Sequence, residues 1–286
     1  MNFQLNLARP SQILFPLAVI LEKYYVKTNS VKKIYQIIFC FLFLNSFDAQ
    51  NIYSAIHLND KYKIKVEKPI EKIESTTTFY NTNNIEKRKE IIILNNNFRI
   101  LKELRYNSDG EEIFKMENEY KFDSLKITNK TTRKIPLLGN EIITSSFEYD
   151  SKNFLTKIVK RNNKNQIIET IRFENDDKGN PVLLKINNGE YGYEKATYDY
   201  ENNTYSTFVY NAYNELVSSD KTIRFDFDIP SEDHKFNEYG DLIESKKFKF
   251  EYKYDKFGNW TKETRYKVVG KNKIKDAEFT RKITYK

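Results

Sequence analysis

A five-residue pattern that recurs along the chain constrains the fold more than any other feature. An aromatic residue is followed by Asp or Asn, two variable residues, and Gly or Asn, after which the chain returns to apolar residues. The Asp or Asn side chain can accept backbone N–H groups within a turn, and Gly or Asn tolerates the left-handed conformation that starts a return strand. The pattern therefore predicts β-hairpins joined by a type I turn with a glycine bulge.

Seven copies of this pattern lie between residues 106 and 258. Of the eight glycines in the chain, four occupy the last position of a copy, which chance placement would rarely produce. We expect the turns to be shaped chiefly by Asn107 and Gly110, by Asn237 and Gly240, and by Asp255 and Gly258. The copies are Tyr106–Gly110, Tyr149–Asn153, Tyr210–Asn214, Phe236–Gly240 and Tyr254–Gly258, with weaker ones at Arg161–Asn165 and Asn175–Gly179.

Between the turns, apolar and charged residues alternate with a period of two, which is typical of strands with one covered face. No stretch beyond residue 50 keeps a helical period for more than about two turns. The sequence predicts an all-β fold, an antiparallel meander of consecutive hairpins forming a curled sheet, a sandwich or a partly open barrel. We expect a single domain over residues 50–286. On one face of it would lie Phe248, Phe250, Tyr252 and Tyr254 and, after the turn, Trp260, Thr264 and Tyr266.

Composition supports this class and narrows the partners. The chain has 21 Tyr and 21 Phe among 286 residues, and both types favour the pleated surface of strands. A single cysteine, Cys40, excludes an intramolecular disulfide and a cysteine zinc site. The formal net charge of +8 comes from lysines spread along the chain without a compact arginine cluster, so nucleic acid is not a predicted partner.

Residues 31–49 have the form of a secretory signal peptide. Lys32 and Lys33 precede an apolar run over 34–44, and Ala49 offers a cleavage site. The run is shorter than the about 20 residues that span a bilayer, which leaves a transmembrane helix as the alternative. Because the signal starts far from Met1, we expect translation to begin at Val31 and residues 1–30 to be no part of the protein. Phe39 before Cys40 argues against lipidation. The sequence thus predicts export into the periplasm, to the outer surface or out of a Gram-negative cell, with no integral membrane segment after cleavage.

The copy at Tyr254–Gly258, continued by Asn259, Trp260 and Thr261, resembles the tyrosine-aspartate (YD or RHS) repeat family of bacterial surface and secreted proteins. The resemblance covers roughly residues 100–270. It implies an antiparallel sheet of many hairpins in an exported protein that binds carbohydrate or, in the large members, encloses a toxin. This chain is too short to enclose another domain and lacks the Asp-Pro-x-Gly-Leu-type signature of the toxin shells, so it resembles a short member without that role.

Residues for catalysis are scarce. His57 and His234 are the only histidines, and we expect both in solvated loops. An acidic group around Pro230 offers oxygen ligands for Ca²⁺, although its first two members alternate as the polar face of a strand would. The chain has no glycine-rich phosphate loop, no Gly-x-Ser-x-Gly elbow and no His-Glu-x-x-His. The sequence therefore predicts neither an enzyme nor a cofactor. The acidic group consists of Asp226, Asp228, Glu232 and Asp233.

The aromatic stripe is the one candidate ligand-binding surface in the sequence. Its rings could stack on sugars or line a groove for lipid, or they could simply form the core. The core is the default interpretation of the stripe, and the surplus of tyrosines elsewhere over what a core needs is the only indication of a binding surface. We expect an exported, non-enzymatic β-repeat module that binds or scaffolds at the cell envelope, with glycan as a candidate ligand; an envelope carrier of lipid or lipopeptide is the alternative. The stripe comprises Phe248, Phe250, Tyr252, Tyr254, Trp260 and Tyr266.

Overall fold

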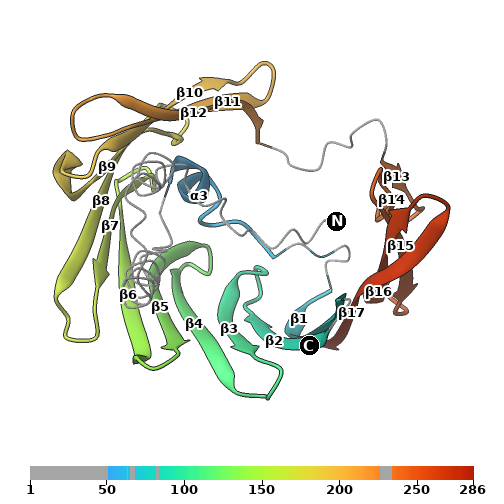
Figure 1. The fold of residues 1–286 in the computed structure, drawn as a ribbon. Coiled ribbons are helices and arrows are strands. Elements are labelled where there is room, and N and C mark those ends of the chain that lie inside the picture. Colours follow the sequence, from blue (N-terminus) through green and yellow to red (C-terminus); the bar gives the residue numbers. More distant parts are fainter. Residues whose placement is uncertain (1–50, 63, 65–67, 82–83, 226–233) are drawn as a thin grey trace, which may run out of the picture.

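The computed structural model describes residues 51–62, 64, 68–81, 84–225 and 234–286 (Figure 1). Within them, seventeen antiparallel strands form one sheet that curls around a short helix. The predicted all-β meander of hairpins in a curled sheet is confirmed, in a form that is neither a sandwich nor closed into a ring. The predicted signal peptide and the candidate calcium residues Asp226, Asp228, Glu232 and Asp233 lie outside the described residues.

The elements follow one another along the chain with short connections. They are α3 (Ile52–Ile56), β1 (Ile70–Asn81), β2 (Asn84–Leu94), β3 (Ile100–Tyr106), β4 (Glu112–Lys121), β5 (Leu125–Ile135), β6 (Gly139–Tyr149), β7 (Leu155–Arg161), β8 (Ile167–Asn175), β9 (Pro181–Ile186), the 3₁₀ turn η2 (Asn187–Gly189), β10 (Tyr193–Asp199), β11 (Thr204–Tyr210), β12 (Leu216–Arg224), β13 (Lys235–Phe236), β14 (Leu242–Glu244), β15 (Phe248–Tyr254), β16 (Trp260–Val269) and β17 (Asn272–Tyr285).

The first and last strands of the chain pair with each other near the middle of the sheet. β1 lies between β2 and β17, with Ile73 opposite both Ile92 and Ile283. From this junction one arm runs through consecutive hairpins from β2 to β12, and the other runs back from β17 to β13. β12 pairs with β11 and β13 with β14, and these two are the outer strands among the described residues. The junction therefore places residues near 75 beside residues near 280.

Eight hairpin turns share one geometry. The side-chain oxygen of the first turn residue accepts the N–H groups of the third and fifth residues at 2.8 to 3.0 Å. The fourth residue has a positive φ, between 59° and 87°. This is the side-chain-capped turn with a left-handed fourth residue that the repeated pattern encodes. The capping residues are Asn95, Asn107, Asp150, Asn162, Asp176, Asn211, Asn237 and Asp255.

The turn at Asn95 carries no sequence pattern of the expected kind. Leu94 precedes it, and its left-handed fourth residue is Phe98, with φ 59°. A bulky residue rarely adopts this conformation, and the sequence pattern requires Gly or Asn at the fourth turn position, so the pattern does not identify this turn. The Phe98 ring packs against the apolar cluster around Ile73, and this burial offsets the backbone strain. The remaining signal in the sequence is the polar run Asn95–Asn97 between two apolar segments.

Two apolar clusters stabilise the arms where the chain segment before β1 packs on the sheet. Ile52 of α3 is fully buried among side chains of β7 to β10, including Ile158 and Ile171. The second cluster centres on Ile73 and Ile92 at the β1 junction. The helix itself starts at Asn51, whose side chain accepts the Ser54 N–H at 2.7 Å as an N-cap.

Turn capping is extended by tyrosines from neighbouring strands. The Tyr285 hydroxyl donates to Asp255 Oδ2 and accepts from Asn259 Nδ2 at 2.9 Å. The Tyr200 hydroxyl makes the corresponding pair of bonds to Asp176 and Asn180. A tyrosine near the end of one hairpin thus fixes the turn of the hairpin before it, which accounts for part of the high tyrosine content.

Asp255→Ala is expected to lower the free energy of unfolding more than Asp150→Ala. Both substitutions remove a side chain that accepts two backbone N–H groups, a loss of about 1–2 kcal/mol. Asp255 also accepts the Tyr285 hydroxyl, which would lose a partner in a half-buried position. Urea denaturation of both variants measures the difference. Asp255→Ala, Tyr285→Phe and the variant with both substitutions form a double-mutant cycle. Equal losses for Asp255→Ala and Asp150→Ala would show that the hydrogen bond from Tyr285 adds no stability.

Candidate functional site

The segment before β1 crosses the concave side of the curled sheet. We call residues 51–62 and 64 the strap. Its Ile52 N–H donates to Glu194 Oε2 on β10 at 2.8 Å, and its Tyr62 N–H donates to the Phe98 carbonyl at 2.7 Å. Between these points, Asn59 Oδ1 accepts the Lys126 N–H of β5. The strap thus connects both sides of the long arm, and Figure 1 shows α3 inside the curve.

Side chains directly opposite on paired strands share a face, so the strap identifies the concave one. Ile73 packs with Tyr62 of the strap, and alternation places Thr77 of β1 on the same face. Thr77 lies opposite Phe279, which lies opposite Glu263, which in turn lies opposite Tyr252. The stripe Phe248, Phe250, Tyr252 and Tyr254 therefore lies on the concave face.

Two rows of side chains cross this face over five strands, and we call them the concave belt. One row runs from Arg88 through Thr77, Phe279 and Glu263 to Tyr252. The other runs from Glu86 through Phe79, Ala277 and Arg265 to Phe250. Both rows exist because β1 pairs with β17, which brings residues 77–88 beside residues 250–279. Each row contains two rings and two charged side chains together with Thr77 or Ala277. Phe250, Glu263 and Ala277 are buried, and the other three rings are half-buried.

The aromatic and cationic groups of the belt touch one another. The Arg265 guanidinium lies 5.1 Å from the Phe248 ring centroid and 5.7 Å from that of Phe279. The rings of Phe79 and Phe279 meet edge to face at 6.4 Å. Arg88 lies over Phe79 at 5.4 Å. Each cation thus covers a ring face, an arrangement in which both remain ordered without complete burial.

The predicted aromatic set is only partly brought together. Phe250 is 8% exposed and belongs to the core of this face, while Phe248, Tyr252 and Tyr254 are half-buried. Trp260 is buried, with the Arg281 guanidinium 3.7 Å from its ring centroid. The stripe is therefore neither fully covered nor fully open.

Tyr266 lies on the opposite, convex face. It pairs with Lys249, and its hydroxyl donates to Glu251 Oε2 at 3.0 Å. We expected Trp260 and Tyr266 to share a face. The pairing of β15 with β16 shifts its register between Lys253 and Tyr254, and that expectation did not allow for the shift. Such a bulge adds one residue, so the facing of the strand reverses beyond it. Glu263 and Arg265 take the concave positions instead.

The Tyr254 ring is held by the neighbouring turn. Its hydroxyl donates to Asp241 Oδ2 at 2.7 Å and accepts from Asn237 Nδ2 at 2.6 Å, and the ring stacks on Tyr239 with centroids 4.1 Å apart. Burial raises the pKa of the Tyr254 hydroxyl. Tyr254 is thus a structural residue that joins two turns, and its ring is not free to stack on a ligand.

Carboxyl groups on the concave face have displaced pKa values. Burial raises the pKa of Glu263 to about 7. Burial and the neighbouring Glu103 carboxylate raise the pKa of Glu90 to about 7, against the opposing effect of Arg105, whose Nε lies 3.3 Å from Glu90. Burial also raises the pKa of Glu194, beneath the strap, to about 7. The face therefore holds polar groups that exchange protons near neutral pH.

The sequence interpretation missed the residues that the β1–β17 junction contributes. Phe79, Arg88 and Phe279 alternate with polar neighbours as expected of strands, but nothing local shows that they lie beside Tyr252. Of the surplus tyrosines, Tyr198 and Tyr205 stack in a cluster with Phe225, while Tyr191 and Tyr213 are exposed at 71% and 83%.

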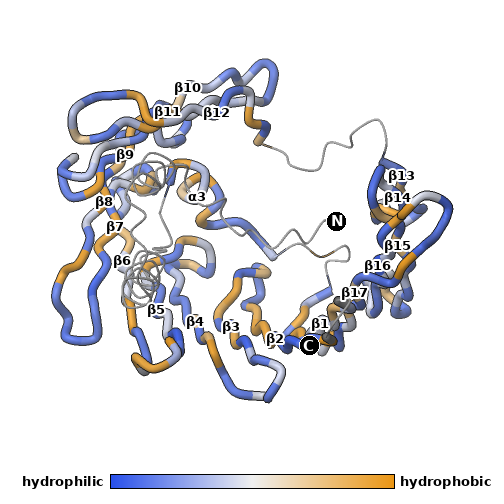
Figure 2. The backbone as a smooth tube through the Cα atoms, in the orientation of Figure 1, coloured by the Kyte–Doolittle hydropathy of each residue, from blue (hydrophilic) through white to orange (hydrophobic). Residues whose placement is uncertain are grey.

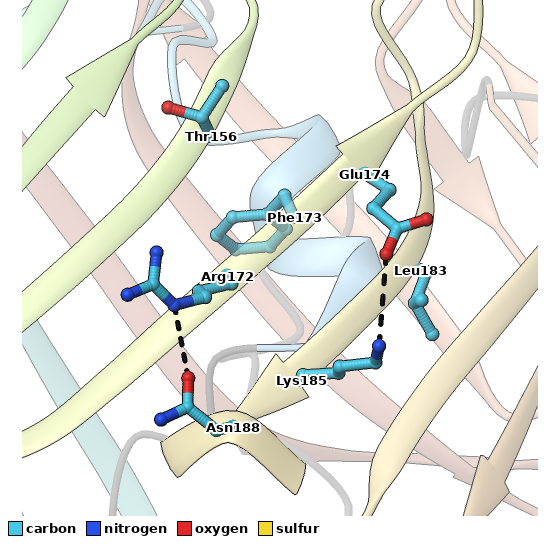
Figure 3. Close-up of a pocket in the computed structure, with 7 residues that line it drawn as sticks. All are labelled: Thr156, Arg172, Phe173, Glu174, Leu183, Lys185 and Asn188. Carbon is cyan, nitrogen blue, oxygen red and sulfur yellow. Dashed lines mark hydrogen bonds and ion pairs between the residues drawn. The ribbon is translucent and has the colours of Figure 1, made fainter.

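A separate shallow pocket of about 420 Å³ lies on the convex face of β7 to β9 (Figure 3). Its charged groups are paired, since Arg172 Nε donates to Asn188 Oδ1 at 3.1 Å and Lys185 lies 3.8 Å from Glu174. Charged groups of the belt are paired as well, since the Nε atoms of Arg265 and Arg88 each lie 2.6 Å from a carboxylate oxygen, of Asp276 and Glu86 respectively. We regard the concave belt as the stronger candidate because its rings and charged groups continue over five paired strands. The pocket is lined by Thr156, Arg172, Phe173, Glu174, Leu183, Lys185 and Asn188.

His57 follows α3, half-buried, with Nδ1 2.7 Å from Asp60 Oδ2. Across residues 51–62, 64, 68–81, 84–225 and 234–286, no three His, Cys, Asp or Glu side chains are grouped so as to hold a metal ion. None of the helices in these ranges has the length and hydrophobicity to span a bilayer.

Comparison with known proteins finds no matching family model and no matching curated protein. Among solved structures, a porin-like protein from Bacteroides uniformis ATCC 8492 matches at 12% identity and a TM-score of 0.27, covering 76% of this chain and 97% of that one. The Photorhabdus luminescens Tc holotoxin pore with the mutation TccC3-D651A matches at 11% identity and a TM-score of 0.21, covering 71% of this chain and 11% of the toxin chain. Likenesses this weak carry no argument about function.

Proposed function

We propose that this protein is an exported, non-enzymatic module of the bacterial cell envelope whose concave belt binds glycan. The observation that carries the proposal is that half-buried rings and charged groups lie together on one face across five strands. Proteins bind sugars in two ways: aromatic rings stack on the C–H groups of the sugar, and charged side chains form hydrogen bonds with its hydroxyl groups. The belt offers both kinds of group on one continuous face.

The same observation weighs against the carrier alternative. An acyl chain needs an apolar lining, since leaving a charged group against it without water costs free energy. Glu263, Arg265 and Arg88 lie in the belt between the rings. A polar ligand fits these groups better than a lipid tail.

Export and family membership are parts of the proposal that depend on the sequence. The basic and apolar stretches before Ala49 support a signal peptide, and the repeated capped turns support a short YD-repeat protein. Peptides from residues 31–49 in the exported protein, detected by mass spectrometry, would contradict the proposed cleavage near Ala49.

Glycan binding is expected to depend on the concave side of β15–β16 and not on its convex side. We expect Phe248→Ala and Arg265→Gln each to weaken binding about tenfold, the usual effect of one ring or one cation–ring contact. Tyr266→Ala is the matched control, because it removes a half-buried ring from the other face of the same hairpin. Pull-down on insoluble peptidoglycan and a glycan array measure the binding.

Three results would overturn the proposal. The first is no retention on either glycan probe, and the second is an equal loss in the Tyr266→Ala control. The third is turnover of a glycan by the purified protein, which would make it an enzyme. Native mass spectrometry after mild purification checks the carrier alternative, since a bound lipid at one-to-one stoichiometry would favour it.

A further inference from the structure

The two ends of the sheet differ in what their hairpin turns expose. Consecutive turns of an antiparallel meander alternate between ends. The strap contacts the turn at Asn95 at one end. At the other end lie eight turns: β1–β2, β3–β4, β5–β6, β7–β8, β9–β10 and β11–β12, together with β14–β15 and β16–β17, because β17 runs antiparallel to β1. We call this second end the apolar rim.

Exposed large apolar side chains concentrate at this rim. Of seventeen such residues in the described part of the chain, twelve lie at seven of the eight turns of the rim or within three residues of them, and the β14–β15 turn has none. Each of the seven turns carries at least one, and Figure 2 shows the apolar colour at the outer end of the β5–β6 hairpin. The twelve are Ile85, Ile113, Leu137, Leu138, Ile167, Ile168, Tyr191, Tyr213, Leu216, Val217, Val269 and Ile274.

The tip of the β5–β6 hairpin has no explanation within the fold. Leu137 is completely exposed and has φ 69°, a conformation that turns normally assign to Gly or Asn. Leu138 beside it is 63% exposed. Phe122 at the opposite end of the sheet is also exposed at a positive φ, but Leu137 and Leu138 lie side by side and belong to the larger group of exposed apolar side chains at this rim, which points to a partner outside the chain.

One part of the rim is rich in lysine. The stretch 266–275, which forms the β16–β17 hairpin tip, contains four lysines and no acidic residue, and two of the four, Lys273 and Lys275, are paired with Glu251 and Glu278. The adjacent β14–β15 turn adds exposed Lys246 and Lys247. Val269 and Ile274, exposed at 50% and 55%, lie among these lysines. Apolar side chains flanked by lysines are suited to a lipid bilayer with an apolar interior and anionic headgroups at its surface.

We propose that the apolar rim seats the protein on an anionic phospholipid bilayer. A protein partner needs a compact patch of about 800 Å² per side, whereas the apolar residues here are spread over seven separate tips of a wide curved sheet. A planar fluid surface accepts side chains in such a distribution, because each tip inserts independently. Backbone groups within the hairpins are already bonded in the ladder, so only side chains need to enter the interface.

The test is flotation of the purified protein with vesicles of phosphatidylethanolamine and phosphatidylglycerol at three to one, compared with phosphatidylcholine alone. We expect the double variant Leu137→Asn, Leu138→Asn to bind the anionic vesicles at least about tenfold more weakly. Its fold should persist, because Asn tolerates the positive φ at position 137. Phe122→Asn is the matched control: Phe122 is 79% exposed at φ 53° on the opposite end of the sheet.

A second variant tests the lysines. Lys246→Gln with Lys271→Gln should reduce binding to anionic vesicles and lessen its loss in high salt, since screening acts on exposed charges. Equal vesicle binding by the wild type and the Leu137, Leu138 double variant would overturn the proposal. So would an equal loss in Phe122→Asn. If sedimentation velocity showed self-association that the double variant abolishes, with no vesicle binding by the wild type, the rim would be an interface between two copies instead.

Discussion

Gly192→Ala is expected to lower the free energy of unfolding by about 3 kcal/mol or more, against about 1 kcal/mol for Gly189→Ala. Both glycines lie in the connection between β9 and β10, with φ of +100° and +94°. A side chain at either position meets the same kind of backbone strain. At Gly192 the added Cβ would also lie 2.1 Å from the Tyr210 carbonyl oxygen, while at Gly189 it would meet nothing within 4 Å.

Comparing the two alanine variants separates the cost of backbone strain, which both share, from the cost of the steric clash with Tyr210, which only Gly192→Ala has. Relief at Gly192 requires the Tyr210 backbone to move, and Tyr210 is paired in β11 and stacked on Tyr193 with ring centroids 4.8 Å apart. A shift there would disturb the β10–β11 ladder, so the effect should appear as a loss of cooperative stability in urea denaturation with an unchanged slope. If the two alanine variants were equally stable, the contact between the added Cβ at position 192 and the Tyr210 carbonyl oxygen would not contribute to the free energy of unfolding.

The parts of the fold that local chemistry decides could be predicted from the sequence. The side chain of Asp255 and the conformational freedom of Gly258 act within five residues, so the turn pattern identifies hairpins directly. The turn at Asn95 shows the limit of this reasoning. There the burial of Phe98 supports a positive φ that local preference disfavours.

The candidate site depends on long-range pairing, which a period of two does not specify. Alternation shows that Phe279 and Tyr252 each point to one face of a strand, but it contains no information that β1 joins β17. The single-residue bulge after Tyr254 then reverses the expected facing of Tyr266. A one-residue change of register moves a side chain to the other face, so the belt could be assembled only from the structure.

The protein is expected to lose stability as the pH rises from about 5 to about 7.5. Burial raises the pKa values of Glu90, Glu194 and Glu263 to about 7 from an ordinary value of 4.5. A carboxyl group whose pKa is higher in the folded state holds its proton more tightly there, so folding is favoured below its unfolded pKa and this contribution disappears as pH passes the folded pKa. Each group should contribute on the order of 2 kcal/mol across this window.

Glu74 and Glu278 change their charge at lower pH, so they do not affect stability between about pH 5 and pH 7.5. Hydrogen bonds from lysine side chains lower the pKa values of Glu74 and Glu278, so the stability that these pairs provide is lost only as pH falls below the ordinary carboxyl range. The melting temperature should therefore be highest near pH 5 and decline on both sides.

Glu194→Gln identifies the source of the alkaline decline. Glutamine keeps an oxygen that can accept the Ile52 N–H, which Glu194 accepts at 2.8 Å, and it carries no ionisable proton. The variant should melt at nearly the same temperature as the wild type at pH 5 and above it at pH 7.5, while Glu174→Gln, at a side chain that is 67% exposed, should leave the profile unchanged. Ionisation of Glu194 above pH 7 places a charge in a buried position beneath the strap, and the bond from the Ile52 N–H, which favours the charged form, offsets only part of that cost. A decline with the same slope in Glu194→Gln would place the titrating group elsewhere on the concave face, with Glu263→Gln as the next variant to measure.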